Sequence, residues 1–467
     1  MNIAHGCCFA SSSHLRRRGR TFKETDQVKT AEIILKGGTV VNHDGVGQRD
    51  IAITNGKIVG IGHYVKEQAG EVIDCEGLHI LPGVVDSQVH LREPGAEHKE
   101  DLETGGRAAV QGGVTAVFEM PNTNPLTVTE AALADKVARA TNRMHCDFAF
   151  YMGGTRDNAH LLGEFERLPG CAGIKVFMGS STGTLLVEDD DGVATILKNI
   201  RRRAAFHSED EFRLNERKGE RIKDDPASHP VWRDAEAARL CTERLLRLAR
   251  EAGKRIHVLH VSTADEFPLL AAHRDVATVE VTPHHLCFAL EDYARLGTLI
   301  QMNPPVREAR HRLGVWQALQ SGLVDVLGSD HAPHTMEEKR KSYPESPSGM
   351  PGVQTLVPIM LDYVNKGRLT IERFVDLTSH GPNRIFGMAG KGRIAEGYDA
   401  DLTIVDLKAK RQITNDWIES RCKWTPYHDM TVTGWPVGTF VRGRRVMWNG
   451  DITGPAAGQP VRFIEAL

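Results

Sequence analysis

The sequence predicts an α/β fold: a (β/α)8 TIM barrel with a small β-sandwich domain formed by both chain ends. Two observations predict it. Between residues 83 and 390, eight apolar runs of strand length alternate with stretches of helical periodicity. On either side of that region, short β-rich runs follow one another without intervening helices. We therefore expect a disordered leader over residues 1–30, a composite β-sandwich over 31–82 and 391–467, and a barrel over 83–390.

The leader is set apart by its composition. It holds Ser11–Ser13 and the basic run Arg16–Arg20, and no hydrophobic period is sustained. A twin-arginine export signal is one alternative, but the apolar region that should follow the arginines is missing. A start codon placed too early is another.

The β-rich runs at the two ends have the pattern of consecutive hairpins. Asn-Gly and Gly-Gly, which suit tight turns, separate several of the runs near the N-terminus. The runs cover residues 32–36, 38–41, 50–54, 57–61, 400–406, 431–433, 438–442 and 445–448. Because both sets lie outside the alternating region, we expect them to form one small domain together.

The alternating region supplies eight strand candidates. They cover residues 83–86, 115–119, 147–151, 172–177, 204–206, 256–259, 278–281 and 324–328. Helical text lies between most of them, and residues 235–252 predict a helix with four leucines. An open, doubly wound sheet is the competing architecture, and the absence of a Gly-x-Gly-x-x-Gly run after any strand weakens it.

Composition excludes several function classes. The net charge of −3 over 467 residues gives no electrostatic case for nucleic acid or membrane partners. No stretch approaches the roughly 20 apolar residues of a membrane span. The eight cysteines are scattered, with no Cys-x-x-Cys pair. We expect reduced thiols in a cytoplasmic protein.

Side chains that bind metals collect where the predicted strands end, which is where a barrel of this kind carries its chemistry. In chain order they are Asp86, His90, Lys175, His207, His260 and Asp330. Imidazole and carboxylate groups together suit zinc or a similar divalent ion. A lone histidine at a strand end is more often a hydrogen-bonded core residue, and we expect that role for His257, His284, His285 and His331.

Several of these runs resemble a known family. The segment Asp86–Gly95 is similar to the metal-binding signature after the first barrel strand of the amidohydrolase superfamily, and its tail, HLREPG, resembles the dihydroorotase version. FHSED around His207, LHVST around His260 and SDHAPH around Asp330 resemble further ligand motifs of the superfamily. The resemblance covers about residues 31–455. It implies that His90, Lys175, His207, His260 and Asp330 bind metal, and that Asp330 also moves a proton to the leaving nitrogen.

Lys175 lies in the apolar run GIKVFM, where burial should lower its pKa and leave a neutral amine. Such an amine can add CO2 and become N6-carboxylysine, a carbamate that bridges two metals. The run resembles that of hydantoinases and allantoinases, in which the lysine has this role. The alternative is a lysine paired with a buried acid.

Gln88 departs from the family pattern, which is His-x-His at this point. A glutamine offers one neutral oxygen and is a poorer zinc ligand than imidazole. We therefore expect one or two zinc ions per chain, with one position bound tightly and the other weakly or not at all.

Four residues bear on the substrate. The planar fork of Arg92 suits a carboxylate. Asn122 in MPNTNP, Asn303 in MNPPVR and His334 in SDHAPH resemble substrate-contacting positions of dihydroorotases. The resemblance implies reversible hydrolysis of (S)-dihydroorotate to N-carbamoyl-L-aspartate, a step of pyrimidine synthesis. It also implies a small-molecule substrate with a carboxylate and a homodimer or homotetramer.

Two alternatives stay open. The chain resembles allantoinases and hydantoinases or dihydropyrimidinases in its lysine run. It also resembles catalytically silent dihydroorotase-like chains that serve as scaffolds for aspartate carbamoyltransferase. Gln88 favours the scaffold, whereas retention of the other five ligands opposes it. A polar segment over residues 343–349 is either a lid or an exposed connection.

Overall fold

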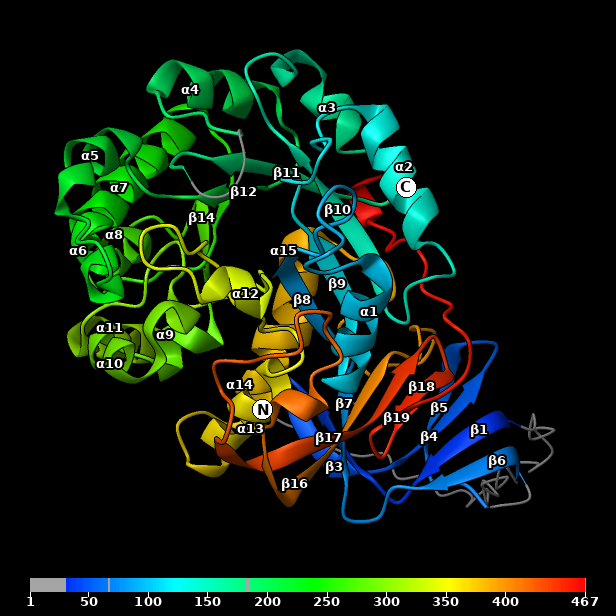
Figure 1. Ribbon diagram of the computed structural model, residues 1–467. Helices are drawn as coiled ribbons and strands as arrows, with labels where there is room; N and C mark the ends of the chain where they lie inside the picture. Colours follow the sequence, from blue (N-terminus) through cyan, green and yellow to red (C-terminus); the bar gives the residue numbers. More distant parts are fainter. Residues whose placement is uncertain (1–30, 66–67, 181–184, 467) are drawn as a thin grey trace, which may run out of the picture.

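Eight parallel strands form a nearly closed barrel in the computed structural model, which describes residues 31–65, 68–180 and 185–466 (Figure 1). The predicted leader lies outside these residues. The strands are β8 (Val84–Val89), β9 (Val114–Glu119), β10 (Asp147–Gly153), β11 (Cys171–Phe177), β12 (Ala204–His207), β13 (Ile256–Val258), β14 (Ala277–Val281) and β15 (Val326–Leu327). They pair in chain order, and a bridge between Val89 and His331 closes the ring. The predicted barrel is confirmed.

Helices follow most of the strands, chiefly around the outside of the barrel (Figure 1). They are α1 (Leu102–Gln111), α2 (Glu130–Ala140), α3 (Leu162–Phe165), α4 (Asp190–Asn199), α5 (Glu211–Glu216), α6 (His229–Trp232), α7 (Ala235–Glu251), α8 (Phe267–Ala271), α9 (Pro283–Cys287), α10 (Tyr293–Leu296), α11 (Ala309–Gln320), α12 (Met336–Lys339), α13 (Leu356–Asn365), α14 (Ile371–Val375) and α15 (Gly381–Phe386). The predicted helix over residues 235–252 is α7, which Asp234 caps by accepting a hydrogen bond from the Ala237 amide. None of the described helices is long and apolar enough to cross a membrane.

Strands from both chain ends share one sheet. The N-terminal strands are β1 (Ala31–Lys36), β2 (Thr39–Asn42), β3 (Gly45–Gln48), β4 (Asp50–Thr54), β5 (Lys57–Gly62), β6 (Ala69–Asp74) and β7 (His79–Pro82). The C-terminal strands are β16 (Leu402–Gln412), β17 (Thr431–Val441), β18 (Arg444–Trp448) and β19 (Asp451–Ile452). One sheet has the order β19-β18-β17-β16-β7-β2-β3, and the other has the order β5-β4-β1-β6. Leu35 and Ile51 of one sheet pack in the same apolar cluster as Ile80 and Leu402 of the other, as a sandwich requires.

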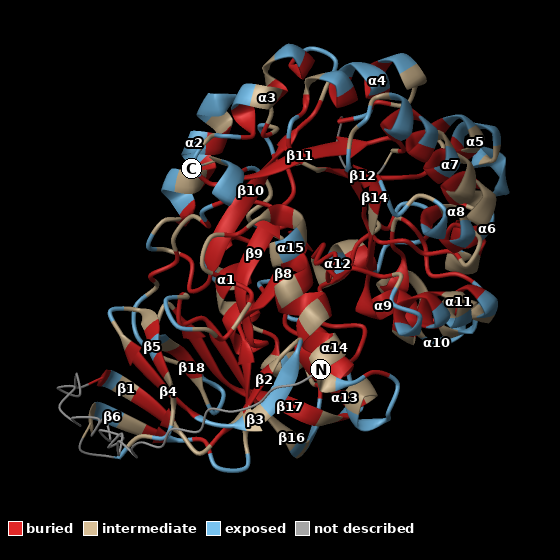
Figure 2. Cartoon of the chain, turned by 180° about the vertical axis from the view of Figure 1, so that it is seen from behind, coloured by how far each residue is buried: buried red, intermediate tan, exposed pale blue. Residues whose placement is uncertain are grey.

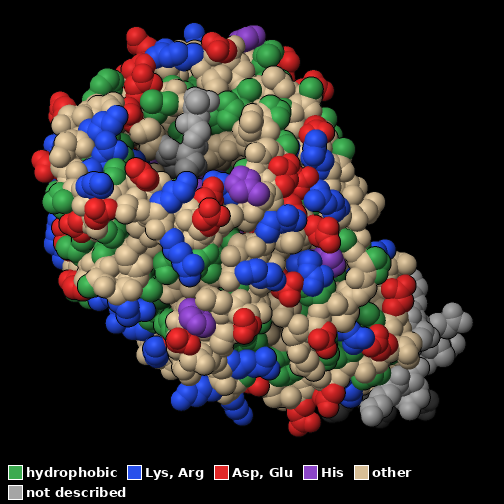
Figure 3. Space-filling view, viewed as in Figure 1, with side chains coloured by type: hydrophobic (Ala, Val, Ile, Leu, Met, Phe, Trp, Pro, Cys, Tyr) green, Lys and Arg blue, Asp and Glu red, His purple; other side chains and the backbone are tan. Residues whose placement is uncertain are grey.

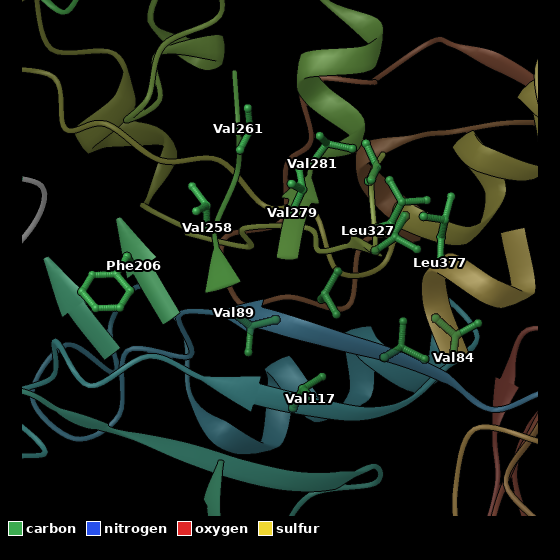
Figure 4. Packing of buried hydrophobic residues seen from close by; sticks show 14 of the residues in the cluster. Val84, Val89, Val117, Phe206, Val258, Val261, Val279, Val281, Leu327 and Leu377 are labelled. Carbon is green, nitrogen blue, oxygen red and sulfur yellow. The ribbon is translucent and has the colours of Figure 1, made fainter. Parts of the chain in front are cut away.

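The barrel strands are buried along their lengths, as the view from behind shows (Figure 2). Branched side chains such as Val89, Val258 and Leu327 belong to one buried apolar cluster (Figure 4). Close packing of this kind holds the backbone rigidly. The side chains at the strand ends therefore project from a fixed frame.

Lys391 joins the barrel to the sandwich. Its ammonium lies 2.8 Å from Asp147 on β10, 3.5 Å from Asp399 and 2.5 Å from Asp401. Burial opposes the charge, but the three carboxylates raise the pKa of Lys391 above its ordinary value. Further along the chain, residues near the C-terminus turn back to β10, where the Phe148 amide donates to the Gln459 carbonyl.

Candidate metal centre

A cavity opens at the carboxyl ends of the barrel strands. Its lining residues are Gln88, His90, Lys175, Phe177, His207, His260, Met302, Asn303, Asp330, Ala332, Ser348 and Gly349. The five predicted ligands and Gln88 are therefore brought together, although they are spread over more than half of the chain. On the face of the molecule seen in Figure 3, acidic and basic side chains are mixed, without a large patch of one sign.

His207 and His260 form the tighter pair of candidate ligands. The Nδ1 atom of His207 lies 3.0 Å from Nε2 of His260. Two nitrogens that bind one tetrahedral zinc ion at about 2.0–2.1 Å lie roughly 3.3 Å apart. The Nδ1 atom of His260 has no hydrogen-bond partner among the described residues. Burial lowers the pKa of both imidazoles, so they are neutral, as metal ligands must be.

Glu209 and Arg233 orient His207 from behind. The Glu209 carboxylate accepts a hydrogen bond from His207 Nε2 at 2.9 Å and pairs with the guanidinium of Arg233. Burial opposes the charge of Glu209, yet Arg233 and His207 hold its pKa below the usual range. Because the carboxylate keeps the proton of His207 on Nε2, the Nδ1 lone pair faces the cavity.

Lys175 is buried without a hydrogen-bond partner. Its Nζ atom lies 4.3 Å above the Phe177 ring, and no ion pair is recorded for it among the described residues. Burial lowers the pKa of Lys175 to about 7, although the negative charges of Asp330 and Glu280 oppose the shift. A large share of this amine is therefore neutral at neutral pH. The alternative of a lysine paired with a buried acid lacks the contact that it needs.

His90 and Asp330 face each other on the other side of the cavity. His90 Nε2 lies 3.3 Å from Asp330 Oδ1, and His90 Nδ1 lies 2.8 Å from Asn122 Oδ1. Since the Asn122 oxygen accepts a proton from Nδ1, the lone pair of the neutral ring is on Nε2, the atom that lies beside Asp330. The backbones of Arg92, His260 and Asp330 have positive φ angles of 65°, 38° and 48°. Such conformations are uncommon for non-glycine residues and gather at functional sites.

Gln88 occupies the gap beside this pair. Its Nε2 atom donates to Asp330 Oδ1 at 3.1 Å, and its Oε1 atom has no hydrogen-bond partner among the described residues. An amide that donates through nitrogen cannot ligate through the same atom. In the described part of the chain, no three His, Cys, Asp or Glu side chains gather as a metal cluster. The donors fit one divalent ion at His207, His260 and Lys175, and they fit a second at His90 and Asp330 less well.

The predicted substrate residues adjoin the lining of the cavity. Arg92 donates from Nε to the Pro333 carbonyl at 3.0 Å, and its Nη2 lies 3.2 Å from His334 Nε2. Lys99 Nζ lies 3.1 Å from His334 Nδ1. Burial lowers the pKa of Arg92 only to about 10, so it keeps its charge at neutral pH. A cationic group therefore lies next to the candidate ligands. Asn303 lines the cavity directly, whereas Asn122 reaches it through His90.

The histidines expected in core roles are all buried. His257 bonds to Thr278, His285 lies between Thr282 and the Pro304 carbonyl, and His331 accepts from the Gly352 amide. The Nε2 atoms of His257, His284 and His331 have no hydrogen-bond partner among the described residues.

Sequence reasoning missed four residues around the cavity. Glu209 stands two residues after His207, and this local signal was available within FHSED. No local sequence signal marks Arg233, His229 or Trp424, because the fold brings them to the site from distant parts of the chain. Trp424 donates from its indole to the His334 carbonyl at 2.8 Å, from a segment that follows β16.

The segment at residues 343–349 is partly buried, because Tyr343 and Ser346 are buried whereas Pro344 and Glu345 are exposed. Tyr343 is 1% exposed, and Ser348 and Gly349 line the cavity. The segment therefore forms part of the cavity wall.

Comparison with known proteins gives consistent matches. Residues 79–446 match the amidohydrolase family. A dihydroorotase of Halobacterium salinarum is 38% identical, with 89% of this chain and 96% of the relative covered. An L-hydantoinase of Paenarthrobacter aurescens is 33% identical, with 90% and 95% covered. Among solved structures, the L-hydantoinase (dihydropyrimidinase) from Arthrobacter aurescens superposes with a TM-score of 0.88 at 32% identity, with 92% and 99% covered.

Proposed function

The chain belongs to the amidohydrolase family and is a cyclic amide hydrolase, and we propose that it interconverts dihydroorotate and N-carbamoyl-aspartate. The observation that carries this choice of substrate is the charged Arg92 beside His334, next to the candidate ligands. Dihydroorotate has a ring carboxylate that this guanidinium can bind. Hydantoins and dihydropyrimidines generally lack it. The relatives named dihydroorotase, at 38% identity and below, support the same choice.

Hydantoin or dihydropyrimidine hydrolysis is the second candidate. The TM-score of 0.88 to an L-hydantoinase favours it, as does the lysine on the fourth strand. The buried, converging side chains oppose the scaffold role. Drift after loss of activity should have replaced several of the ligands, whereas only the position of Gln88 departs from the family pattern.

A bound divalent ion, which we propose is zinc, would polarise the amide carbonyl and lower the pKa of a water molecule. The side chains of this chain would do the rest. Arg92 and Asn303 would hold the oxygens of the substrate, with Asn122 fixing the ring of His90. The Asp330 carboxylate would take a proton from the attacking water and deliver it to the leaving nitrogen.

Lys175 would become a ligand by reaction with CO2. The amine nitrogen forms a bond to the carbon of CO2, one proton leaves the nitrogen, and a carbamate with one negative charge results. The buried, unpartnered Nζ and its lowered pKa support this step. Mass spectrometry of the intact, undenatured protein should show an added 44 Da that Lys175→Met abolishes.

Gln88 would make the metal loading unequal. Its Nε2 atom is held by Asp330 at 3.1 Å, which leaves the neutral Oε1 atom as the only donor to a metal, and a neutral amide oxygen is a poorer zinc ligand than imidazole. We expect about one tightly bound zinc ion per wild-type chain and about two per Gln88→His chain, counted by plasma mass spectrometry after dialysis. Two equally tight ions in the wild type would contradict this.

We also propose a homodimer or homotetramer. Exposed apolar side chains between β12 and α7, namely Phe212, Ile222 and Val231, support an association surface.

The direct test is a parallel assay of the zinc-loaded protein on dihydroorotate, allantoin and dihydrouracil. We expect the highest kcat/KM on dihydroorotate. A preference for allantoin or dihydrouracil would replace the proposal by the corresponding alternative, and no turnover of any would favour the scaffold.

A further inference from the structure

His229 is a buried residue, 1% exposed, that no sequence motif indicated. It opens the four-residue helix α6, outside the ring of barrel strands. Its Nε2 atom lies 2.9 Å from the Met302 carbonyl oxygen and 3.0 Å from Asn303 Oδ1. Its Nδ1 atom lies 3.3 Å from the Tyr343 hydroxyl. The ring therefore touches a cavity-lining residue on one side and the segment at residues 343–349 on the other.

These contacts determine which nitrogen carries the proton. The Met302 carbonyl can only accept, so Nε2 must donate. The same N–H lies close enough to Asn303 Oδ1 to share the bond. Nδ1 is then bare and accepts from the Tyr343 hydroxyl. The ring is neutral, because burial and the nearby charge of Arg233 lower the pKa of His229 to about 3.

Asn303 is oriented by this arrangement. A free asparagine side chain can present either its oxygen or its NH2 group to a ligand. With Oδ1 held by His229, the NH2 group is the one left for the cavity that Asn303 lines. A donor there suits a carbonyl or carboxylate oxygen and disfavours a ligand N–H.

The cavity wall is fastened to the same stretch of chain. Gly349 donates from its amide to the Gln301 carbonyl at 2.8 Å, and Gln301 Nε2 donates to the Ser346 carbonyl at 2.9 Å. The Tyr343 hydroxyl adds a third hydrogen bond, to Nδ1 of His229, whose other ring nitrogen contacts Asn303. The segment at residues 343–349 and the Asn303 amide are thus held by one network.

We propose that His229 is a positioning residue that fixes the Asn303 amide as a hydrogen-bond donor to a substrate oxygen and links it, through Tyr343, to the cavity wall. This inference rests on the proposed function only in taking a cyclic amide as the ligand. It does not depend on which cyclic amide binds.

The test compares His229→Phe, His229→Gln and Tyr343→Phe in the metal-loaded protein, on whichever of dihydroorotate, allantoin and dihydrouracil the wild type hydrolyses fastest. Phenylalanine fills the space without a donor, whereas the glutamine NH2 group can still donate to Asn303. We expect KM to rise about tenfold for His229→Phe, with kcat within about twofold. His229→Gln should recover most of the loss, and Tyr343→Phe should raise KM about twofold to threefold.

Two controls separate positioning from folding. His145→Phe replaces a buried histidine just before the amino end of β10, away from the carboxyl ends of the strands, and should leave KM unchanged. Zinc content should match the wild type in all variants. An unchanged KM for His229→Phe would overturn the inference, and so would equal losses for His229→Phe and His229→Gln or a loss that follows zinc content. If the wild type hydrolyses allantoin in preference to dihydroorotate, the proposed function fails while the His229 series still decides this inference.

Discussion

Arg92 combines burial with a retained charge. It is 8% exposed, its backbone has a positive φ, and its side chain makes hydrogen-bonding contacts among the described residues only to the Pro333 carbonyl and the ring of His334. No carboxylate is recorded in an ion pair with it in the described part of the chain. A buried guanidinium without a paired acid is costly, and an anionic ligand would offset that cost.

Arg92→Ala should therefore weaken binding of a carboxylate more than catalysis in general. A charge-assisted hydrogen bond contributes about 1.5–3 kcal/mol, so kcat/KM for dihydroorotate should fall roughly 10- to 100-fold. Dihydrouracil, which lacks the carboxylate, serves as the control substrate in the same steady-state assay. Equal losses on both substrates, or no loss on dihydroorotate, would remove Arg92 from the carboxylate role.

Glu209→Gln tests how His207 is oriented. The amide oxygen can still accept from His207 Nε2, but the negative charge that pairs with Arg233 is lost. Zinc affinity, measured by competition with a chelator, should fall about 10- to 100-fold. Glu236→Gln on α7 is the matched control, because it pairs with Arg239 on the outer surface. Equal affinities for the two variants would contradict a role for Glu209 at the metal site.

At the residue scale, the sequence predicted those site residues that are marked by a local pattern. His207 and His260 end apolar strands, so the barrel brings them together once the strands are placed. His229 and Trp424 depend on contacts 74 and 90 residues away along the chain, to Asn303 and His334. No local pattern encodes such contacts, and these residues were missed for that reason.

At the scale of elements, β9 and α2 are held together by a buried ion pair. Lys136 Nζ lies 2.8 Å from Glu119 Oε2, and both side chains are 1% exposed. Burial raises the pKa of Glu119 to about 6, although Lys136 opposes the shift. The pair stands directly before Met120–Asn122, so it fixes the loop that carries Asn122 to His90.

Lys136→Met should leave Glu119 buried without a partner and lower the free energy of unfolding by about 3–5 kcal/mol. Urea denaturation measures the change. The double variant with Glu119→Leu should recover most of the loss, since it removes the orphaned charge. Asp135→Asn, which breaks an exposed pair with Arg139 on the same helix, should cost less than about 1 kcal/mol. Similar costs for the buried and the exposed pair would contradict this account.

The eight barrel strands and helix α7 were predicted because their apolar patterns are long or repeated. Short helices were not predicted, and α6 is the clearest case. Its four residues, His229–Trp232, have no periodicity to detect, and they are held in place by contacts with Tyr343 and Met302. An element stabilised by its surroundings leaves little trace in its own sequence.

At the scale of the whole molecule, stability should depend on pH through a buried acid. Burial raises the pKa of Glu266 from 4.5 to about 7, against a hydrogen bond from Thr242 and the charge of Arg307. Between these two values the unfolded chain is ionised at Glu266 while the folded chain holds the proton. This group therefore lowers stability as pH rises from 4.5 to 7 and adds no further loss above that.

Glu266→Gln should remove this contribution. Its stability advantage over the wild type should grow between pH 4.5 and 7, by up to about 3 kcal/mol, and stay constant at higher pH. Urea denaturation of both proteins at pH 5, 6, 7 and 8 measures it. A difference that is the same at all four values would show that Glu266 does not titrate in this window.

The composite sandwich was predicted because β-rich runs flank the barrel at both ends. The way in which it packs against the barrel was not predicted. That contact includes the buried ion pairs of Lys391 with Asp147, Asp399 and Asp401, which come from distant segments of the chain. The sequence pattern indicates strands and turns. It does not indicate which charged residues meet where the two domains pack together.

We propose that one tightly held metal ion at the mouth of this barrel suffices for hydrolysis of dihydroorotate. Zinc titration of the metal-free protein, with dihydroorotate turnover measured at each step, tests it most directly. The account predicts that turnover rises with the first equivalent of zinc and reaches its plateau near one ion per chain. No turnover of dihydroorotate at any zinc content, or a rise that begins only with the second equivalent, would contradict it.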